Sequence, residues 1–384
     1  MSANTDFDVI IIGGGLVGAS LALALARQRW RVALLEGQPQ ETPDLQSWDA
    51  RIYAISPANR DFLAGLGAWP GMERIGTVAR MDVRGDQGGR LEFSAGEIGA
   101  PALAWIAENR WMLAALWREI RQSDIQVLDG AQAQTLITDV RQARLTLSDG
   151  RSLSASLLVG ADGANSWVRR QTGLEAKVKP YRQSGVVANF DCELAHGDVA
   201  RQWFFGDSVL AWLPMAGKRI SMVWSTFDPE RLLALDAGQL AHTVAEAGGR
   251  ALGTLSTLTA AHAFPLRLIR PEAVVQQRVA LVGDAAHTVH PLAGQGVNLG
   301  FQDAVALAAL LAKGGDPGLW QTLSRYQRNR REAVLTMQLS CDGLFSLFHQ
   351  SSLPGLARLR NTGLSLVNHL GPLKRKFARH AVGC

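Results

Sequence analysis

A glycine-rich turn near the N-terminus constrains the fold of this chain more than any other feature. A mostly apolar segment, Phe7 to Ile12, runs into the sequence GGGLVG, and an Ala/Leu-rich segment follows. This order predicts a strand, a tight turn and a helix, the start of a βαβ unit that binds a dinucleotide. Gly13 permits the turn, Gly15 lets the backbone approach a pyrophosphate, and Gly18 lets the helix pack against the strand.

A carboxylate follows at the place where such a unit binds a ribose. The second apolar run, Val32 to Leu35, ends on Glu36, whose side chain can accept hydrogen bonds from ribose hydroxyls. The phosphates are expected at the N-terminus of the intervening helix. No other G-x-G-x-x-G sequence follows a predicted strand, so we expect one dinucleotide site of this kind.

The elements expected along the chain predict a dinucleotide-binding domain made of separate pieces. An Asp-Gly hairpin signal at 149–150 and a mostly β stretch at 186–224 interrupt the alternation of strands and helices. The apolar segment 279–282 then has the composition of a buried parallel strand, and helices are expected at 110–122 and 298–313. We therefore predict an α/β fold. Its parts are a discontinuous Rossmann-like domain (1–76, 100–175 and 272–335), an inserted β-sheet substrate domain (77–99 and 176–271) and a helical C-terminal segment (336–384).

Composition and charge limit the classes of partner. The chain has 39 basic and 34 acidic residues, a net charge of +5, which is too small and too dispersed to indicate nucleic acid binding. Cys192, Cys341 and Cys384 neither pair evenly nor have metal-ligand spacing, which favours a reducing compartment without disulfides. There is no signal peptide pattern, and no apolar run reaches the roughly 20 residues of a membrane-spanning helix. We therefore expect a cytoplasmic protein.

Two further turns place a carboxylate after an apolar strand. Asp162 lies in GADGANS, and Asp284 lies in VGDAAH. Taken alone, the first turn fits a helix cap equally well, with Asp162 and Ser166 accepting hydrogen bonds from free amides. The second turn, of near-identical form, together with the N-terminal glycine turn favours binding of a cofactor.

These three turns resemble the class A FAD-dependent aromatic monooxygenases, the p-hydroxybenzoate-hydroxylase-like group, and the resemblance covers essentially the whole chain. Within that group, ARIYAIS at 50–56, the sequence at 287–303 and a C-terminal tail of the Leu-Lys-Arg type are similar to the ubiquinone-biosynthesis hydroxylases. The resemblance implies a Rossmann-like FAD-binding domain with an inserted β-sheet substrate domain.

The resemblance also assigns cofactor-binding residues. It places Gly13, Gly15, Gly18 and Glu36 at the ADP part of FAD, Arg51 and Arg110 along the FAD, Asp162 at FAD and transiently bound NAD(P)H, Asp284 at the ribityl or pyrophosphate region, and the backbone of Gly294, Gly296, Val297 and Asn298 at the isoalloxazine. A loop that opens a helix supplies amide donors and a positive dipole end, which would stabilise negative charge on a reduced flavin.

The implied activity is hydroxylation of the aromatic ring of a polyprenyl phenol or benzoquinol in ubiquinone biosynthesis, with NAD(P)H and O2, through a flavin C4a-hydroperoxide. No catalytic side chain is expected, because the cofactor carries the chemistry. His290 and Pro291 are candidates for the pocket wall. A metal site at His287 and His290 is rejected, since no third ligand has recognisable spacing.

Two alternatives to this activity stay open. One is another flavin oxidoreductase, a reductase, on the same scaffold. The other is a non-catalytic, FAD-containing accessory subunit of a membrane-associated quinone-biosynthesis complex.

The C-terminal tail combines leucines with a one-sided charge. No acidic residue follows Asp342, whereas six basic residues do: Arg358, Arg360, Lys374, Arg375, Lys376 and Arg379. Such a segment either packs on the body of the protein as an amphipathic helix or makes peripheral contact with the inner face of a membrane.

Overall fold

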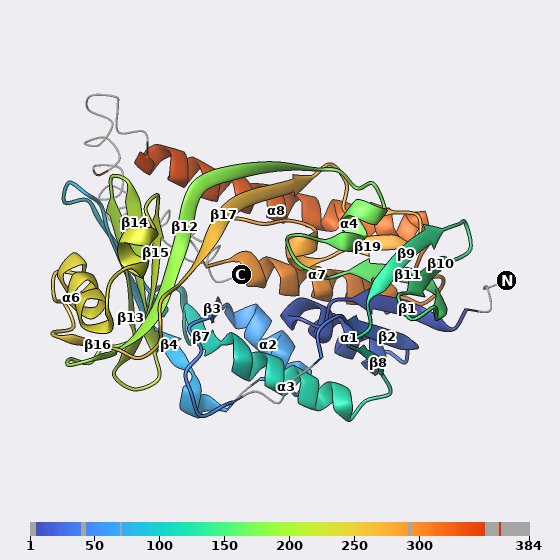
Figure 1. The fold of residues 1–384 in the computed structure, drawn as a ribbon, viewed down its shortest axis with the longest axis horizontal. Helices are drawn as coiled ribbons and strands as arrows, with labels where there is room; N and C mark the ends of the chain where they lie inside the picture. The colour runs from blue at the N-terminus through green and yellow to red at the C-terminus, as the bar shows by residue number, and fades with distance from the viewer. Residues whose placement is uncertain (1–4, 40–43, 70, 291–293, 350–360, 362–384) are drawn as a thin grey trace.

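The computed structural model describes residues 5–39, 44–69, 71–290, 294–349 and 361 (Figure 1). It confirms the predicted α/β fold. Three sheets lie along the molecule, with the smallest between the two larger ones (Figure 1).

The first sheet contains the predicted βαβ unit. Its strands are β1 (Phe7–Ile12), β2 (Val32–Glu36), β8 (Gln126–Asp129), β9 (Ala133–Thr138), β10 (Ala143–Leu147), β11 (Ser152–Gly160), β18 (Val275–Gln276) and β19 (Val279–Leu281). The order is β18-β19-β11-β1-β2-β8, with β10 joining β11 to β9. β1 is parallel to β2 and β11, and β11 is parallel to β19. Segments far apart in the sequence therefore bring the ends of three neighbouring strands to one edge.

Helices pack around this sheet. They are α1 (Leu16–Arg27), α2 (Pro57–Gly65), α3 (Asn109–Arg121), α4 (Trp167–Gln171), α7 (Gly296–Leu311) and α8 (Trp320–His349). α3 begins and ends one residue before the predicted limits, and α7 begins and ends two residues before them. α1 and α7 lie so close that a Cβ on Gly300 would come 2.6 Å from Val17 Cγ2.

The second sheet is mostly antiparallel and forms the other end of the molecule. Its order is β16-β12-β15-β14-β13-β5-β6, and β17 also pairs with β12. The strands are β5 (Arg80–Arg84), β6 (Arg90–Ser94), β12 (Ala176–Cys192), β13 (Val199–Phe205), β14 (Ser208–Met215), β15 (Arg219–Thr226), β16 (Leu255–Thr257) and β17 (His262–Pro271). α5 (Glu230–Leu233) and α6 (Ala237–Ala247) follow β15, and Leu240 of α6 packs in one core with Trp212 and Phe190 of the sheet.

The smallest sheet is β3 (Ile52–Ile55), β7 (Ala104–Glu108) and β4 (Gly76–Val78). Short 3-10 turns lie at η1 (Met72–Arg74), η2 (Gly96–Ile98) and η3 (Gly283–Ala285).

The strands of the two large sheets come from different stretches of the chain, and the limits of the two domains stay a prediction. Apart from Asn361, the part of the predicted helical C-terminal segment that follows His349 lies outside the described residues. Among the helices that are described, none has both the length and the apolar character needed to cross a membrane.

Candidate functional site

The glycine turn between β1 and α1 has the geometry that the sequence predicted. Gly13 has φ +108°, and a Cβ on it would lie 2.4 Å from the Ala161 carbonyl oxygen. A Cβ on Gly18 would lie 1.9 Å from the Gly13 carbonyl oxygen. Gly15, the N-cap of α1, is different, because a Cβ there would meet nothing within 4 Å. Two glycines thus permit close packing, and the third faces open space at a helix N-terminus, where amides can bind phosphate.

Glu36 lies directly beside this turn. Its Oε2 accepts a hydrogen bond from the Gly14 amide at 2.7 Å, and its Oε1 accepts one from the Gln38 amide at 3.0 Å. Trp117 of α3 holds the turn from the other side, since its Nε1 donates to the Gly14 carbonyl at 3.0 Å. The carboxylate is therefore fixed in place, and each oxygen keeps a second lone pair that can accept from a ribose hydroxyl.

Asp284 lies in η3, just after β19. Its side chain is exposed, yet burial raises the pKa of its carboxyl, with His287, Arg51 and Arg267 acting in the opposite direction. Both properties fit a carboxylate that is surrounded by protein atoms but points into open space. Burial also raises the pKa of Tyr53, which lies within electrostatic reach of Asp284 and Arg51.

Behind Asp284, a buried ion network fixes the turn. Asp303 of α7 has no exposed side-chain surface; its Oδ2 accepts from the Gly283 amide at 2.9 Å and from His287 Nε2 at 2.7 Å. Its Oδ1 accepts from Arg330 Nε of α8 at 2.6 Å. Burial raises the pKa of Asp303, but the charges and hydrogen bonds of His287 and Arg330 outweigh it and hold that pKa below its ordinary value. Sequence reasoning assigned Asp303 no role, although a lone carboxylate in an apolar helix needs a buried partner.

The loop before α7 supplies a second free helix N-terminus. Gly294 has φ +60°, α7 begins at Gly296, and a Cβ on Gly296 would meet nothing within 4 Å. Val297 is half-buried beside it. Backbone amides at this end of α7 could bind a ligand, and the predicted contact of the 294–298 segment with the isoalloxazine stays a prediction.

The side chain of Asn298 has a different role. It is buried, its Oδ1 accepts from the Ser56 amide at 3.0 Å and from Asn59 Nδ2 at 2.8 Å, and its Nδ2 donates to the Ala54 carbonyl at 2.8 Å. The side chain therefore ties α7 to the segment at 50–56, and the predicted contact with a cofactor is left to its backbone.

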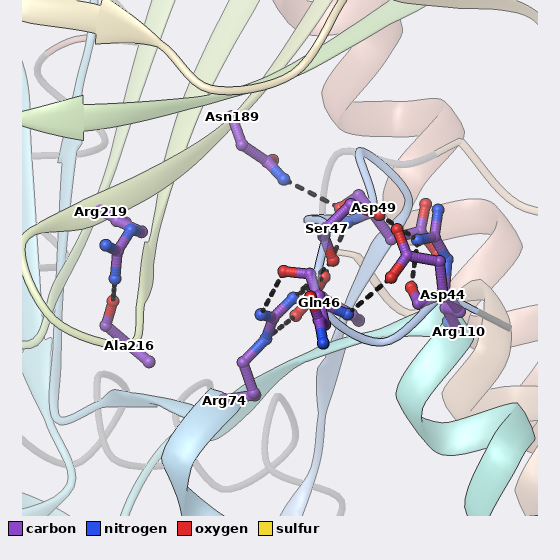
Figure 2. A network of polar contacts seen from close by, with 10 residues as sticks. Asp44, Gln46, Ser47, Asp49, Arg74, Arg110, Asn189, Ala216 and Arg219 are labelled. Atoms are coloured by element: carbon purple, nitrogen blue, oxygen red, sulfur yellow. Dashed lines mark hydrogen bonds and ion pairs between the residues drawn. The ribbon is translucent and has the colours of Figure 1, made fainter.

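Arg110 belongs to a polar network around the loop at 44–51 (Figure 2), and the Arg51 amide donates to Asp49 of the same network. The guanidinium of Arg110 donates to the Asp44 carbonyl at 2.6 Å and to Ser47 Oγ at 2.7 Å. The Asp49 carboxylate accepts from the amides of Arg51, at 2.9 Å, and Arg110, at 3.1 Å. In this arrangement Arg110 holds the loop that carries Arg51. The predicted contacts of both arginines with FAD stay predictions.

Asp162 caps a helix. Its carboxylate accepts from Ser166 Oγ at 2.6 Å and from the amides of Trp167, at 2.6 Å, and Val168, at 3.0 Å. Ser166 in turn accepts from the Arg169 amide at 2.9 Å. The capping interpretation accounts for these contacts, and the role of Asp162 toward FAD and NAD(P)H stays a prediction.

His290 lies in an aromatic cluster. It is buried, its ring centroid is 4.7 Å from that of Tyr181 and 5.1 Å from that of Phe345, and its Nε2 is 3.3 Å from Gln183 Oε1. These contacts suit a wall, as predicted; Pro291 lies outside the described residues. Within the described parts of the chain, no group of three or more His, Cys, Asp or Glu side chains could hold a metal ion.

These residues fit FAD. Two helix N-termini have glycines with open space, a fixed carboxylate lies at the end of β2, and the exposed carboxylate of Asp284 lies within electrostatic reach of Tyr53. Anionic phosphates suit the first helix N-terminus, and hydroxyl donors suit the carboxylates.

Comparisons with known proteins agree with this fit. The FAD binding domain family matches residues 6–338. The chain is 35% identical to 3-demethoxyubiquinol 3-hydroxylase of Escherichia coli (strain K12), over 99% of both chains. It is also 35% identical to ubiquinone hydroxylase UbiL of Rhodospirillum rubrum, over 100% of this chain and 91% of that protein. The fold is similar to Pseudomonas aeruginosa PqsL in complex with 2-aminobenzoylacetate (TM-score 0.79, 23% identity, 93% of this chain and 99% of the other). It is also similar to Klebsiella pneumoniae HpxO complexed with FAD and uric acid (TM-score 0.75, 20% identity, 97% of each).

Proposed function

Because the chain belongs to the FAD binding domain family and is an FAD-dependent monooxygenase, we propose that it hydroxylates the aromatic ring of a polyprenyl phenol or benzoquinol in ubiquinone biosynthesis, with NAD(P)H and O2. The observation that carries the proposal is the full-length identity of 35% to two proteins named for hydroxylation in this chemistry.

Different residues of the chain would bind different parts of FAD. Gly15 and the first amides of α1 would hold the pyrophosphate, Glu36 a ribose, and Asp284 the ribityl or pyrophosphate region. The amides at the start of α7 would lie at the isoalloxazine, where the positive end of the helix stabilises negative charge. When bound, FAD supplies the redox and oxygen-transfer chemistry.

The aromatic cluster around His290 would limit access of water to the reacting ring. Tyr181, His290 and Phe345 pack edge to face or tilted, and the buried Leu266 and Leu268 lie in the same cluster. An apolar wall of this kind suits a ring with a prenyl tail. Excluding water protects the oxygen-transfer step from side reactions.

Turnover by the purified FAD-loaded protein tests the proposal. A short-chain prenyl phenol, NAD(P)H and O2 are supplied, and mass spectrometry of the product is compared with NAD(P)H consumption. We expect a product heavier by one oxygen, with 18O incorporated from labelled O2. NAD(P)H oxidation without a hydroxylated product would instead support a reductase. FAD retention without NAD(P)H oxidation would support the accessory subunit, and either result overturns the hydroxylase assignment for the substrates supplied.

We also propose peripheral contact with the inner face of a membrane through the C-terminal tail and, as a partner, a quinone-biosynthesis complex. Except for Asn361, the residues after Leu353 lie outside the described residues, so the support is the acid-free, leucine-rich sequence. Flotation of full-length protein and a protein ending at Leu353 with anionic liposomes tests the contact. We expect less flotation of the truncated protein, and weaker flotation of the full-length protein at high salt. Equal flotation of both proteins would contradict the proposal.

A further inference from the structure

A charged cleft lies at the free edge of the second sheet. β5 is parallel to β13 and antiparallel to β6. The register places Asp82 opposite Glu92 on one side and Arg201 on the other. Because alternate residues of a strand share a face, Arg80, Asp82 and Arg84 project to the same side. That side is hollowed into a cleft of about 510 Å³.

Part of the charge in this cleft is neutralised internally. Asp82 is buried and accepts from Arg84 Nη2 at 2.9 Å and from Arg90 Nε at 3.1 Å. Arg90 also pairs with Glu92. The guanidinium groups of Arg84 and Arg90 hold the pKa of Asp82 below its ordinary value, against the effect of burial. This carboxylate therefore already accepts hydrogen bonds from two arginines.

Arg80 and Arg201 are different, because no carboxylate in the described parts of the chain pairs with either of them. Arg80 Nη2 donates to the Gly197 carbonyl at 3.4 Å, and Arg201 Nη1 donates to the carbonyls of His196, at 3.2 Å, and Val199, at 3.3 Å. Each guanidinium has five N–H donors, so most donors of both arginines are free of these protein contacts.

Arg201 lies in a partly buried position, where an incompletely paired charge is unfavourable. Its side chain is half-buried, and burial lowers the pKa of its guanidinium; Arg84 and Arg80 act in the same direction, and Asp82 acts against them. Arg201 forms no direct ion pair with a carboxylate of the described residues, so an anion in the same cleft would offset part of the desolvation of its charge.

We propose that this cleft binds a phosphate group through Arg80 and Arg201. Guanidinium forks match the oxygens of phosphate and donate charge-assisted hydrogen bonds to them. Val199, opposite Arg80 in the register of β13 and β5, also lines the cleft. The volume lies in the range of small-ligand pockets, roughly 300–1,000 Å³. The proposal does not depend on the activity proposed for the FAD site.

Calorimetric titration of the full-length, FAD-loaded protein at constant ionic strength tests the site. The probes are inorganic pyrophosphate and dihexanoyl phosphatidylglycerol below its micelle concentration. We expect saturable binding of at least one probe. The double variant Arg80→Gln/Arg201→Gln should weaken that binding by about tenfold or more, because both guanidinium groups that would donate charge-assisted hydrogen bonds to the phosphate are lost.

The matched control is Arg141→Gln/Arg144→Gln, which removes the same charge from exposed positions beside and on β10, in the other large sheet. It should bind as the wild type does. Binding of pyrophosphate alone would identify a soluble phosphate compound as the ligand, and binding of the lipid alone would identify a headgroup. No saturable binding of either probe, unchanged affinity in the Arg80/Arg201 variant, or an equal loss in the control would overturn the proposal. Flavin absorbance and far-UV circular dichroism verify that each variant is folded.

Discussion

Asp284 is placed so that its ionisation has opposite consequences for stability and for cofactor binding. Burial raises the pKa of this carboxyl, so its ionised form destabilises the FAD-free fold as pH rises from about 4, the ordinary value, through the raised pKa. We expect Asp284→Asn to raise the Tm of the FAD-free protein near pH 7, where the wild type carries that cost. The same variant should retain FAD less well, because it loses a charged acceptor.

Thermal unfolding from about pH 4 to pH 8 and an FAD titration measure both effects. Asp149→Asn is the control, because Asp149 is exposed and pairs only with Arg151 at the surface. Full FAD affinity in Asp284→Asn would show that this carboxylate does not bind the cofactor.

Asp303 has the reverse pH dependence. Its pKa is held below the ordinary value, so its contribution to stability is complete above about pH 4 and is lost as pH falls through the folded pKa. Asp303→Asn should lower the free energy of unfolding near pH 7 by about 3–5 kcal/mol, because the buried Arg330 loses its charged partner. Urea unfolding near pH 7 and below pH 4 measures this.

In the wild type the loss of stability on the acid side should be steeper than in Asp303→Asn. Asp149→Asn again serves for comparison, since its pair with Arg151 is exposed to solvent and should contribute little to stability. Equal stability of Asp303→Asn and wild type near pH 7 would contradict the role given to the network.

At the scale of elements, the glycines of the turn between β1 and α1 have two different roles, one in packing and one in binding. A Cβ on Gly15 meets nothing within 4 Å, whereas a Cβ on Gly18 comes 1.9 Å from the Gly13 carbonyl oxygen. Gly15→Ala should therefore fold normally but bind FAD about tenfold or more weakly, because its methyl occupies the space of the ligand. Gly18→Ala should destabilise the fold by roughly 1–3 kcal/mol, as other overpacked sites do. Circular dichroism, urea unfolding and FAD titration compare the two. A Gly15→Ala protein with wild-type FAD affinity would argue against a phosphate at this turn.

The elements that sequence reasoning predicted well are those with a local signal. β1, α1 and β2 followed from an apolar run, a glycine turn and a second apolar run, and the helix at 110–122 was displaced by one residue. The roles of Asn298 and Asp303 depend on distant partners. Ser56 lies 242 residues from Asn298 in sequence, and nothing near either residue specifies that contact. The resemblance identified the segments that meet at the site, but side-chain directions required the fold.

At the scale of the whole molecule, the loop at 44–51 joins the cofactor side to the second sheet (Figure 2). Asn189 of β12 has no exposed side-chain surface, and its Nδ2 donates to the Asp49 carbonyl at 2.8 Å. Arg219 of β15 and Arg74 lie over the Trp48 ring, with their guanidinium carbons 4.8 Å and 3.7 Å from its centroid. Because Asp49 also positions the amides of Arg51 and Arg110, a change in the second sheet can reach the cofactor residues through this loop.

Asn189→Ala tests that connection. The variant leaves the Asp49 carbonyl without its buried donor, which should lower the free energy of unfolding by about 1–3 kcal/mol. It should also increase the rate of FAD release severalfold, because the loop that carries Arg51 is held less firmly. Stopped-flow release of FAD and urea unfolding measure the two effects. Lys177→Gln, on the same strand, removes an exposed pair with Glu272 and should change neither stability nor FAD release appreciably. If Asn189→Ala lost stability but released FAD at the wild-type rate, the loop would connect the sheets without positioning the cofactor.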